Sequence, residues 1–209
     1  MKHEWRKKEK SIYLPKNKPE LVNIPEYRFI TLSGEGNPNS DLFSEHISVL
    51  YNVAYAIKMN IKKVETPPKA YQDWTVYPLE GVWDISENAR PNAEGRINKD
   101  DLVFDLMIRQ PDFVSPDFFN GMIELTKRKK PHPLLDKVEF RKIKEGKCIQ
   151  MLHTGSYDNE PESFKQMEAM VGDLSLKRKS KAHREIYLSD FRKVAEDKLK
   201  TVLRFQLDE

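Results

Sequence analysis

The stretch His183–Lys193, HREIYLSDFRK, places an acidic side chain inside a segment that otherwise favours a β-strand. Side chains alternate along a strand, so Glu185 shares one face with His183 and Tyr187, while Ile186 points to the other face. A glutamate on a strand is most often exposed to water, which is one interpretation of this face. The other interpretation is that the carboxylate lies in a pocket among aromatic rings, where it could bind a cation or accept a proton.

Aromatic residues elsewhere in the chain favour the second interpretation. Tyr51 and Tyr55 are four residues apart and therefore share a face of the helix predicted around them. Trp83 ends the sequence PLEGVW, and Tyr157 ends HTGSY just after a glycine turn. Together these rings predict a cavity with aromatic walls and a carboxylate floor, which suits a flat or cationic organic ligand.

A second glutamate, Glu80, is embedded in a predicted strand in the same way. Strict alternation would place Glu80 and Trp83 on opposite faces, but a β-bulge at Gly81 would bring them together. Glu80 is therefore an alternative to Glu185 as the key carboxylate, and the sequence alone does not choose between them.

The chain lacks the motifs of several common catalytic and cofactor sites. Its five histidines do not have zinc-site spacing, and Cys148 is its single cysteine. SGEGNPNS lacks the Lys-Ser/Thr of a phosphate-binding loop, and HTGSY does not match the Gly-x-Ser-x-Gly of a nucleophilic serine. We therefore expect no metal and no cofactor, and we interpret His153 as a residue that orients a turn.

Composition narrows the class of protein. The 209 residues carry 36 Lys+Arg and 33 Asp+Glu, a net charge of +3 that does not favour nucleic acid as a partner. We interpret the basic clusters Trp5–Lys10, Lys127–Lys130 and Leu176–Lys181 as solvated surface. No apolar run approaches the roughly 20 residues of a membrane span. The charged start has no signal-peptide pattern and Cys148 stands alone, so we expect a cytoplasmic protein with no membrane partner.

Periodicity predicts a repeated order of elements. A first unit has a strand, a helix with Ser40 as N-cap, and two further strands, at Tyr27–Gly36, Pro38–Met59, Trp74–Ile85 and Asp101–Gln110. A helix that begins near Pro116 follows. A second unit repeats the order at Glu145–Tyr157, Glu160–Leu174, His183–Asp190 and Thr201–Leu207. Such self-similarity predicts two related half-units that share one sheet or face each other across a cleft.

From about Tyr13 to Leu207, the chain resembles the GyrI-like small-molecule-binding domains. The resemblance rests on separated stretches: LPKNKPELVNIPEYRFITLSGEGNPNS, LYNVAYAIK, YPLEGVW, FDLMIRQPDFV, HTGSYDNEPESF and HREIYLSDFRK. The pair HTGSY and EIYLSD is similar to the ligand-sensing domains of multidrug-responsive transcription activators. The early stretches look like the longer, standalone branch of the family.

The resemblance implies an α+β fold, with two βαββ units forming an antiparallel sheet with helices and a central ligand pocket. It implies a single domain over 1–209, with pseudo-repeats at about 20–112 and 137–209 and a linking helix at about 115–130. Members bind hydrophobic, planar or cationic compounds, and the buried glutamate that meets the ligand corresponds to Glu185.

Some standalone members resembling this chain are cyclopropanoid cyclopropyl hydrolases with an aromatic cage. The resemblance implies that Tyr55, Trp83 and Tyr187 form such a cage. We also predict Met107 and His153 as ligand-binding residues. In a hydrolase, Glu185 would activate a water that attacks the cyclopropane carbon, and Tyr187 or Tyr55 would bind the carbonyl oxygen. The alternative is a non-catalytic drug-sequestering or sensor protein, or a gyrase-type inhibitor that binds a protein partner.

Overall fold

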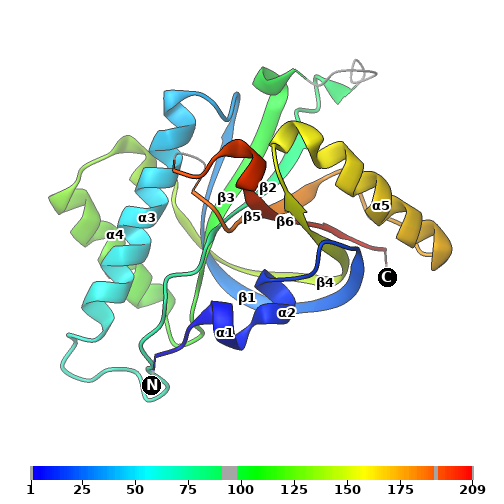
Figure 1. Ribbon diagram of the computed structural model, residues 1–209. Coiled ribbons are helices and arrows are strands. Elements are labelled where there is room, and N and C mark those ends of the chain that lie inside the picture. Colours follow the sequence, from blue (N-terminus) through cyan, green and yellow to red (C-terminus); the bar gives the residue numbers. More distant parts are fainter. Residues whose placement is uncertain (1, 91–97, 191–192, 209) are drawn as a thin grey trace. The chain divides into compact units, whose positions relative to one another are not determined.

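The computed structural model describes residues 2–90, 98–190 and 193–208, so Phe191 and Arg192 of the HREIYLSDFRK stretch lie outside the described residues. Two short helices come first, α1 (Trp5–Lys8) and α2 (Lys10–Tyr13). The longer elements follow in the order β1 (Glu20–Glu35), α3 (Asp41–Ile61), β2 (Leu79–Ile85), β3 (Leu102–Gln110), α4 (Pro116–Lys129), β4 (Glu139–Thr154), α5 (Glu160–Asp173), β5 (His183–Tyr187) and β6 (Lys200–Gln206) (Figure 1).

This order confirms the predicted α+β fold and the repeated strand–helix–strand–strand unit. Three strands begin five or more residues away from the predicted start. β1 begins at Glu20 rather than at Tyr27. β2 begins at Leu79 rather than at Trp74, which instead makes an isolated bridge to His3. β4 begins six residues earlier than expected, at Glu139.

Capping residues explain where the two long helices of the first half begin. The Ser40 side chain accepts a hydrogen bond from the Phe43 backbone N–H at 3.2 Å, as predicted for the N-cap of α3. Ser115 does the same for α4, accepting from Phe118 at 3.1 Å, and Pro116 takes the first helical position.

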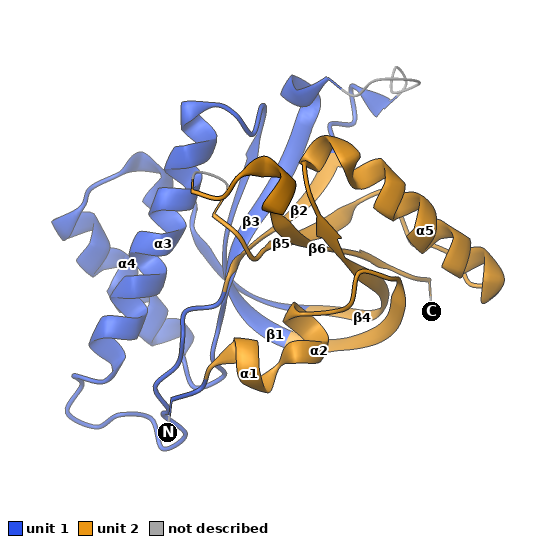
Figure 2. Ribbon diagram, viewed as in Figure 1, with its two compact units in different colours: residues 1–3, 27–77, 85–143 blue, residues 4–26, 78–84, 144–209 orange. Residues whose placement is uncertain are grey.

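The chain divides into two compact units that do not coincide with the sequence repeats. Unit 1 comprises residues 1–3, 27–77 and 85–143, and unit 2 comprises residues 4–26, 78–84 and 144–209 (Figure 2). β2 belongs to the first repeat by its place in the chain, but it lies in unit 2, where it pairs with β5. Residues of both repeats therefore build unit 2.

Unit 1 contains α3, α4, β3 and the second part of β1. β1 and β3 pair antiparallel from Arg28 opposite Gln110 to Glu35 opposite Val103. Helix α3 packs against β3 and α4, and the two helices lie side by side in Figure 1. The buried side chains of α3 recur at steps of three and four residues, as an amphipathic helix requires: Val49, Leu50, Val53, Ala54, Ile57 and Ile61.

Unit 2 contains a four-stranded antiparallel sheet in the order β2–β5–β6–β4. Helix α5 covers one face of this sheet, because Met167 and Val171 share a buried cluster with Met151, Leu203 and Phe205. Burying each large apolar side chain contributes about 1.5–3 kcal/mol, so this layer holds α5 firmly over the strands. The helix thereby covers the strand face on which Glu185 lies.

Arg178 corrects the prediction that Leu176–Lys181 is only solvated surface. Its side chain is 12% exposed, and its Nη1 lies 2.7 Å from Glu168 Oε1. The guanidinium also lies 4.1 Å from the centre of the Phe205 ring, a cation–π contact. Arg178 therefore anchors α5 within unit 2.

None of the helices in the described ranges is both long enough and apolar enough to cross a membrane.

Candidate functional site

β5 carries Glu185 to the face of the unit 2 sheet that α5 covers. The register places Glu185 opposite Gly81 on β2 and Leu203 on β6. Leu203 packs in the cluster beneath α5, so Glu185 points to the same side. Glu185 is only 8% exposed. The interpretation of this face as a wet strand surface is therefore wrong, and the alternation predicted from the sequence is confirmed.

Hydrogen bonds hold the Glu185 carboxylate from two sides. His183 Nε2 lies 3.1 Å from Glu185 Oε1. Tyr187 is also hydrogen-bonded to Glu185, and its hydroxyl oxygen lies 2.7 Å from Trp83 Nε1. An indole N–H can only donate, so the Tyr187 oxygen accepts from Trp83 and its own proton is available for the carboxylate. Trp83 and Tyr187 therefore orient Glu185 through a chain of two hydrogen bonds.

Aromatic rings surround this group. The Tyr157 ring, in the short helix η4 (Tyr157–Asn159), packs edge-on against the Tyr187 ring at 6.3 Å between centroids. The Phe164 ring packs edge-on against His183 at 4.8 Å. Burial, followed by the nearby charge of Glu185, raises the pKa of both Tyr157 and Tyr187. Both phenols therefore remain neutral donors at physiological pH.

A second carboxylate, Glu160, lies beside Glu185. It is the first residue of α5 and is 7% exposed, and its Oε1 has no hydrogen-bond partner among the described residues. Donor or acceptor atoms of Glu160, His183 and Glu185 all lie within 4.8 Å of one another. Burial, then the charges of Glu185 and Asp158, raise the pKa of Glu160 to about 10.

Sequence reasoning missed Glu160, although its spacing carried a signal. Glu160, Phe164, Met167 and Val171 follow one another at steps of four, three and four residues, which places them on one face of a helix. Met167 and Val171 are buried against the sheet, so a glutamate on that same face is forced inward. Acidic residues are common in the first turn of a helix because they interact favourably with the helix dipole. Glu160 therefore looked like an ordinary residue of this kind, although its spacing placed it on the buried face.

Glu80 lies on the opposite face of the same sheet. The β2–β5 register runs without interruption from Glu80 opposite Ile186 to Trp83 opposite His183. The bulge expected at Gly81 is therefore wrong, and strict alternation separates Glu80 from Trp83. Trp83 shares the face of Glu185, whereas Glu80 does not.

A buried network of ion pairs holds Glu80. Arg184 Nη1 lies 2.7 Å from Glu80 Oε2, and Arg184 Nε lies 2.9 Å from Glu145 Oε1. Arg204 Nη1 lies 2.9 Å from the other oxygen of Glu145, and Arg204 Nε and Nη2 donate to Gln150 Oε1. All these groups are nearly inaccessible to solvent. These contacts favour a structural role for Glu80 and leave Glu185 as the better candidate for ligand recognition.

The pKa directions agree with such a network. Burial raises the pKa of Glu80 and outweighs the attraction of Arg184 and Arg204. Burial also acts to raise the pKa of Glu145, but Arg184 and Arg204 together outweigh it, and the net shift is downward. Burial opposes the charge of Arg184, yet Glu145 and Glu80 raise its pKa. Among the described residues, two arginines bind Glu145 directly and one binds Glu80, which explains why their pKa values shift in opposite directions.

His153 orients a turn, as predicted. Its Nε2 lies 2.9 Å from the Ser156 carbonyl oxygen, and its Nδ1 lies 2.9 Å from Ser163 Oγ on α5. The ring is 5% exposed. It therefore joins the end of β4 to α5. Both ring nitrogens are engaged within the protein, which favours this structural role over the ligand-binding role also predicted for His153.

The three other predicted ligand-binding residues belong to unit 1. Tyr51 and Tyr55 lie on α3 with ring centroids 6.3 Å apart, and Tyr55 is 51% exposed. Met107 is fully buried on β3, opposite Thr31 of β1. The predicted sharing of one helix face by the two tyrosines is confirmed.

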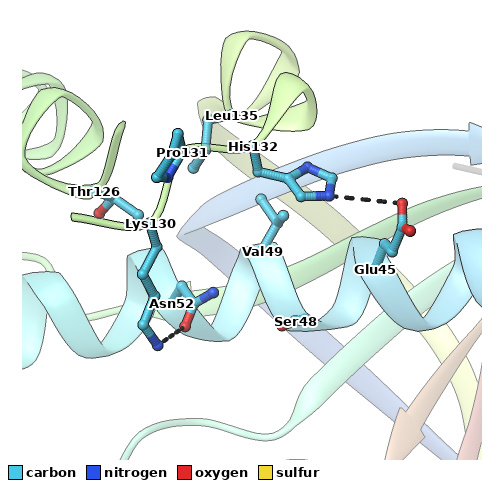
Figure 3. Close-up of a pocket in the computed structure, with 9 residues that line it drawn as sticks. All are labelled: Glu45, Ser48, Val49, Asn52, Thr126, Lys130, Pro131, His132 and Leu135. Carbon is cyan, nitrogen blue, oxygen red and sulfur yellow. Dashed lines mark hydrogen bonds and ion pairs between the residues drawn. The ribbon is translucent and has the colours of Figure 1, made fainter. Parts of the chain in front are cut away.

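Unit 1 also has a surface pocket of about 150 Å³ between α3, the end of α4 and the segment that follows it (Figure 3). Two polar contacts cross it: Lys130 Nζ lies 2.9 Å from Asn52 Oδ1, and His132 Nε2 lies 3.6 Å from Glu45 Oε2. None of the residues predicted to bind a ligand lines this pocket. It is therefore separate from the Glu185 site.

Comparison with known families agrees with this architecture. Residues 17–208 match the family of GyrI-like small molecule binding domains, and the chain belongs to that family. Its class is thus a small-molecule-binding domain built from two βαββ units. Among curated proteins, none matches the chain.

Solved structures give more specific similarities. A hydrolase from Listeria innocua is 33% identical, with a TM-score of 0.88, and the match covers 100% of both chains. Another Listeria innocua hydrolase structure is 32% identical, with a TM-score of 0.87, covering 99% of this chain and 100% of that chain. The C-terminal domain of EcmrR shares the fold at 12% identity, with a TM-score of 0.55 over 92% of this chain and 98% of that chain.

Proposed function

We propose that this protein binds hydrophobic planar or cationic small molecules at Glu185 and hydrolyses cyclopropane-bearing, DNA-alkylating compounds among them. One observation carries the proposal: the Glu185 carboxylate is buried beside aromatic rings and held by His183 and Tyr187. Membership of a small-molecule-binding family and the similarity to Listeria hydrolases support it.

The site suits cation recognition because little water screens its charge. A carboxylate in a region of low dielectric attracts a cation much more strongly than one in bulk water. The neighbouring rings of Trp83, Tyr157 and Tyr187 add apolar surface and π-faces that favour planar and cationic groups. The positive charge and the flat surface of a ligand would be recognised together.

The same carboxylate can act as a general base. In ring opening, a water oxygen bonds to a cyclopropane CH₂ carbon, and one ring C–C bond breaks. The electron pair of that bond moves into the conjugated carbonyl, whose oxygen becomes negative and then takes up a proton. Glu185 accepts the proton that the attacking water loses, and the protonated acid can return it to solvent or product. Strain in the three-membered ring supplies much of the driving force.

Tyr187 acts in this scheme mainly through Glu185. Its hydroxyl already accepts from Trp83 and is bonded to the carboxylate, so it fixes the direction of the base. We therefore assign Tyr187 as a positioning residue rather than as the donor to the substrate carbonyl. Tyr55 remains the proposed donor to that carbonyl.

The experiment is hydrolysis of a spirocyclopropyl-cyclohexadienone alkylator, followed by mass spectrometry of the ring-opened product. Wild-type protein should form the product above the buffer rate, and Glu185→Gln should not. Glu162→Gln is the matched control, because Glu162 is an exposed residue of α5 near the site. No turnover above buffer by the wild type would exclude the hydrolase function.

Non-catalytic sequestration is the second candidate, because the same charge and rings bind a ligand whether or not a water is activated. Quenching of tryptophan fluorescence by a planar cationic dye measures binding alone. Binding that is lost in Glu185→Gln, together with no product from any cyclopropane substrate, would establish sequestration. Tyr51→Ala, Tyr55→Ala and Met107→Ala test the remaining predicted ligand contacts in the same assay.

A further inference from the structure

Two carboxylates and one imidazole converge within unit 2. One atom each from Glu160, His183 and Glu185 lies within 4.8 Å of the other two. Glu160 and Glu185 are buried residues, 7% and 8% exposed, and Glu160 Oε1 has no hydrogen-bond partner among the described residues. An ionised buried oxygen without a donor is costly, so this arrangement requires a proton or a cation at Glu160.

We propose that Glu160 and Glu185 share one proton, so that the site presents a single negative charge and selects ligands that carry a single positive charge. The inference rests on the proposed function, because it concerns the ligand that the same site takes. It assigns Glu160 as a specificity-determining residue.

The relative sizes of the electrostatic effects favour a shared proton. Ionising a second buried carboxylate is costly even after the protein relaxes, and the two like charges add to that cost. The position of Glu160 at the start of α5 favours its anion only weakly by comparison. The upward shift in the pKa of Glu160, caused by burial, Glu185 and Asp158, agrees with this balance.

The other titratable groups around the pair do not change the count of charges. From β5, a neutral His183 can donate its Nε2–H to Glu185, so that bond needs no additional proton. Tyr187 and Tyr157 stay neutral, because burial raises the pKa of both. From β4, His153 is bonded to Ser156 and Ser163. From η4, Asp158 is exposed to solvent and does not belong to the buried cluster, but its charge strengthens the hold of Glu160 on its proton.

A matched pair of ligands tests the charge count. N-methyl-phenylpyridinium and methyl viologen are both flat and similar in size, but the first carries one positive charge and the second two. The monocation neutralises the site as it stands. The dication leaves an excess positive charge unless Glu160 ionises, so its binding should release a proton.

Titration calorimetry in two buffers of different ionisation enthalpy measures that release. At neutral pH the wild type should release close to one proton with methyl viologen and none with the monocation. Glu160→Gln should release none with either ligand and should bind the monocation within about twofold of wild type. Glu185→Gln should weaken monocation binding by about tenfold or more. Glu162→Gln should behave as wild type.

Several outcomes would overturn the inference. The first is binding of methyl viologen without proton release. The second is a loss of about tenfold in monocation affinity in Glu160→Gln. The third is stoichiometric binding of a divalent metal ion by the wild type that is lost in Glu160→Gln. If neither probe binds, cation recognition itself fails, and infrared spectroscopy then tests the shared proton separately. A protonated-carboxyl band should persist in the wild type above neutral pH and disappear in Glu160→Gln. Its absence from the wild type would contradict the shared proton whatever the ligand results.

Discussion

Glu80 and Glu185 lie one register step apart on paired strands, yet their side chains leave opposite faces of the sheet. Gly81 on β2 is the direct partner of Glu185, and Glu80 is the partner of Ile186. Glu80 enters a network of buried arginines, whereas Glu185 lies beneath α5 among aromatic rings. Two glutamates that look equivalent in the sequence therefore differ in environment, and they should differ in function.

Exchanging each carboxylate for its amide separates these roles. Glu80→Gln leaves the buried charge of Arg184 less well compensated and should lower the free energy of unfolding by about 1–3 kcal/mol. Its ligand affinity, measured under folded conditions, should remain close to wild type. Glu185→Gln should show the reverse, weak binding with a small change in stability. Urea denaturation and dye titration of both variants provide the measurements, and equal binding losses would refute the assignment.

Removing the Tyr187 hydroxyl tests the positioning role. Tyr187→Phe deletes the group that links Trp83 to Glu185, so the carboxylate should lose orientation. We expect turnover to fall by about tenfold with little change in KM, and the stability cost should be about 1 kcal/mol. Tyr71→Phe, which removes a hydroxyl from unit 1, is the control for general effects of such a change. Unchanged kcat in Tyr187→Phe would show that the hydrogen bond is not needed.

The pH dependence of stability should report on Glu160. Its folded-state pKa, about 10, is above the ordinary value of 4.5, so the folded protein holds a proton that the unfolded chain releases. The stability that this proton contributes is fully present below the pKa of Glu160 in the unfolded chain. It is lost as pH rises toward the pKa of Glu160 in the folded protein. The free energy of unfolding of Glu160→Gln, relative to that of the wild type, should therefore increase with pH by up to about 1.4 kcal/mol per pH unit. Unfolding midpoints of wild type, Glu160→Gln and Glu162→Gln, between about pH 5 and pH 9, measure this. A difference in stability between wild type and Glu160→Gln that does not change with pH would contradict the raised pKa of Glu160.

Cys148 should be unreactive in the folded protein. The residue is fully buried, and burial, with the charge of Glu145, raises its pKa to about 12. The thiolate is the reactive form, so a thiol-specific reagent should not label Cys148 in native protein and should label it fully in denaturant. Rapid labelling without denaturant would show that the structure around Cys148 opens readily.

The sequence predicted the order of elements because periodicity and capping are local properties. Ser40 and Ser115 cap helices through bonds to residues three positions away, so their effect can be inferred from neighbours in the chain. The alternation of Glu185 and Ile186 was predictable for the same reason. The start of β2 was not, because Trp74 has strand-forming neighbours but finds its partner at His3, far away in the sequence.

What the sequence by itself determined is the family, the repeated βαββ order and the face of β5 on which Glu185 lies. Only the tertiary structure decided that α5 covers this face, that Glu80 belongs to the arginine network, and that Glu160 meets Glu185. The reason is physical. Local hydrogen bonding and side-chain period depend on adjacent residues, whereas burial and charge pairing depend on which distant segments pack together.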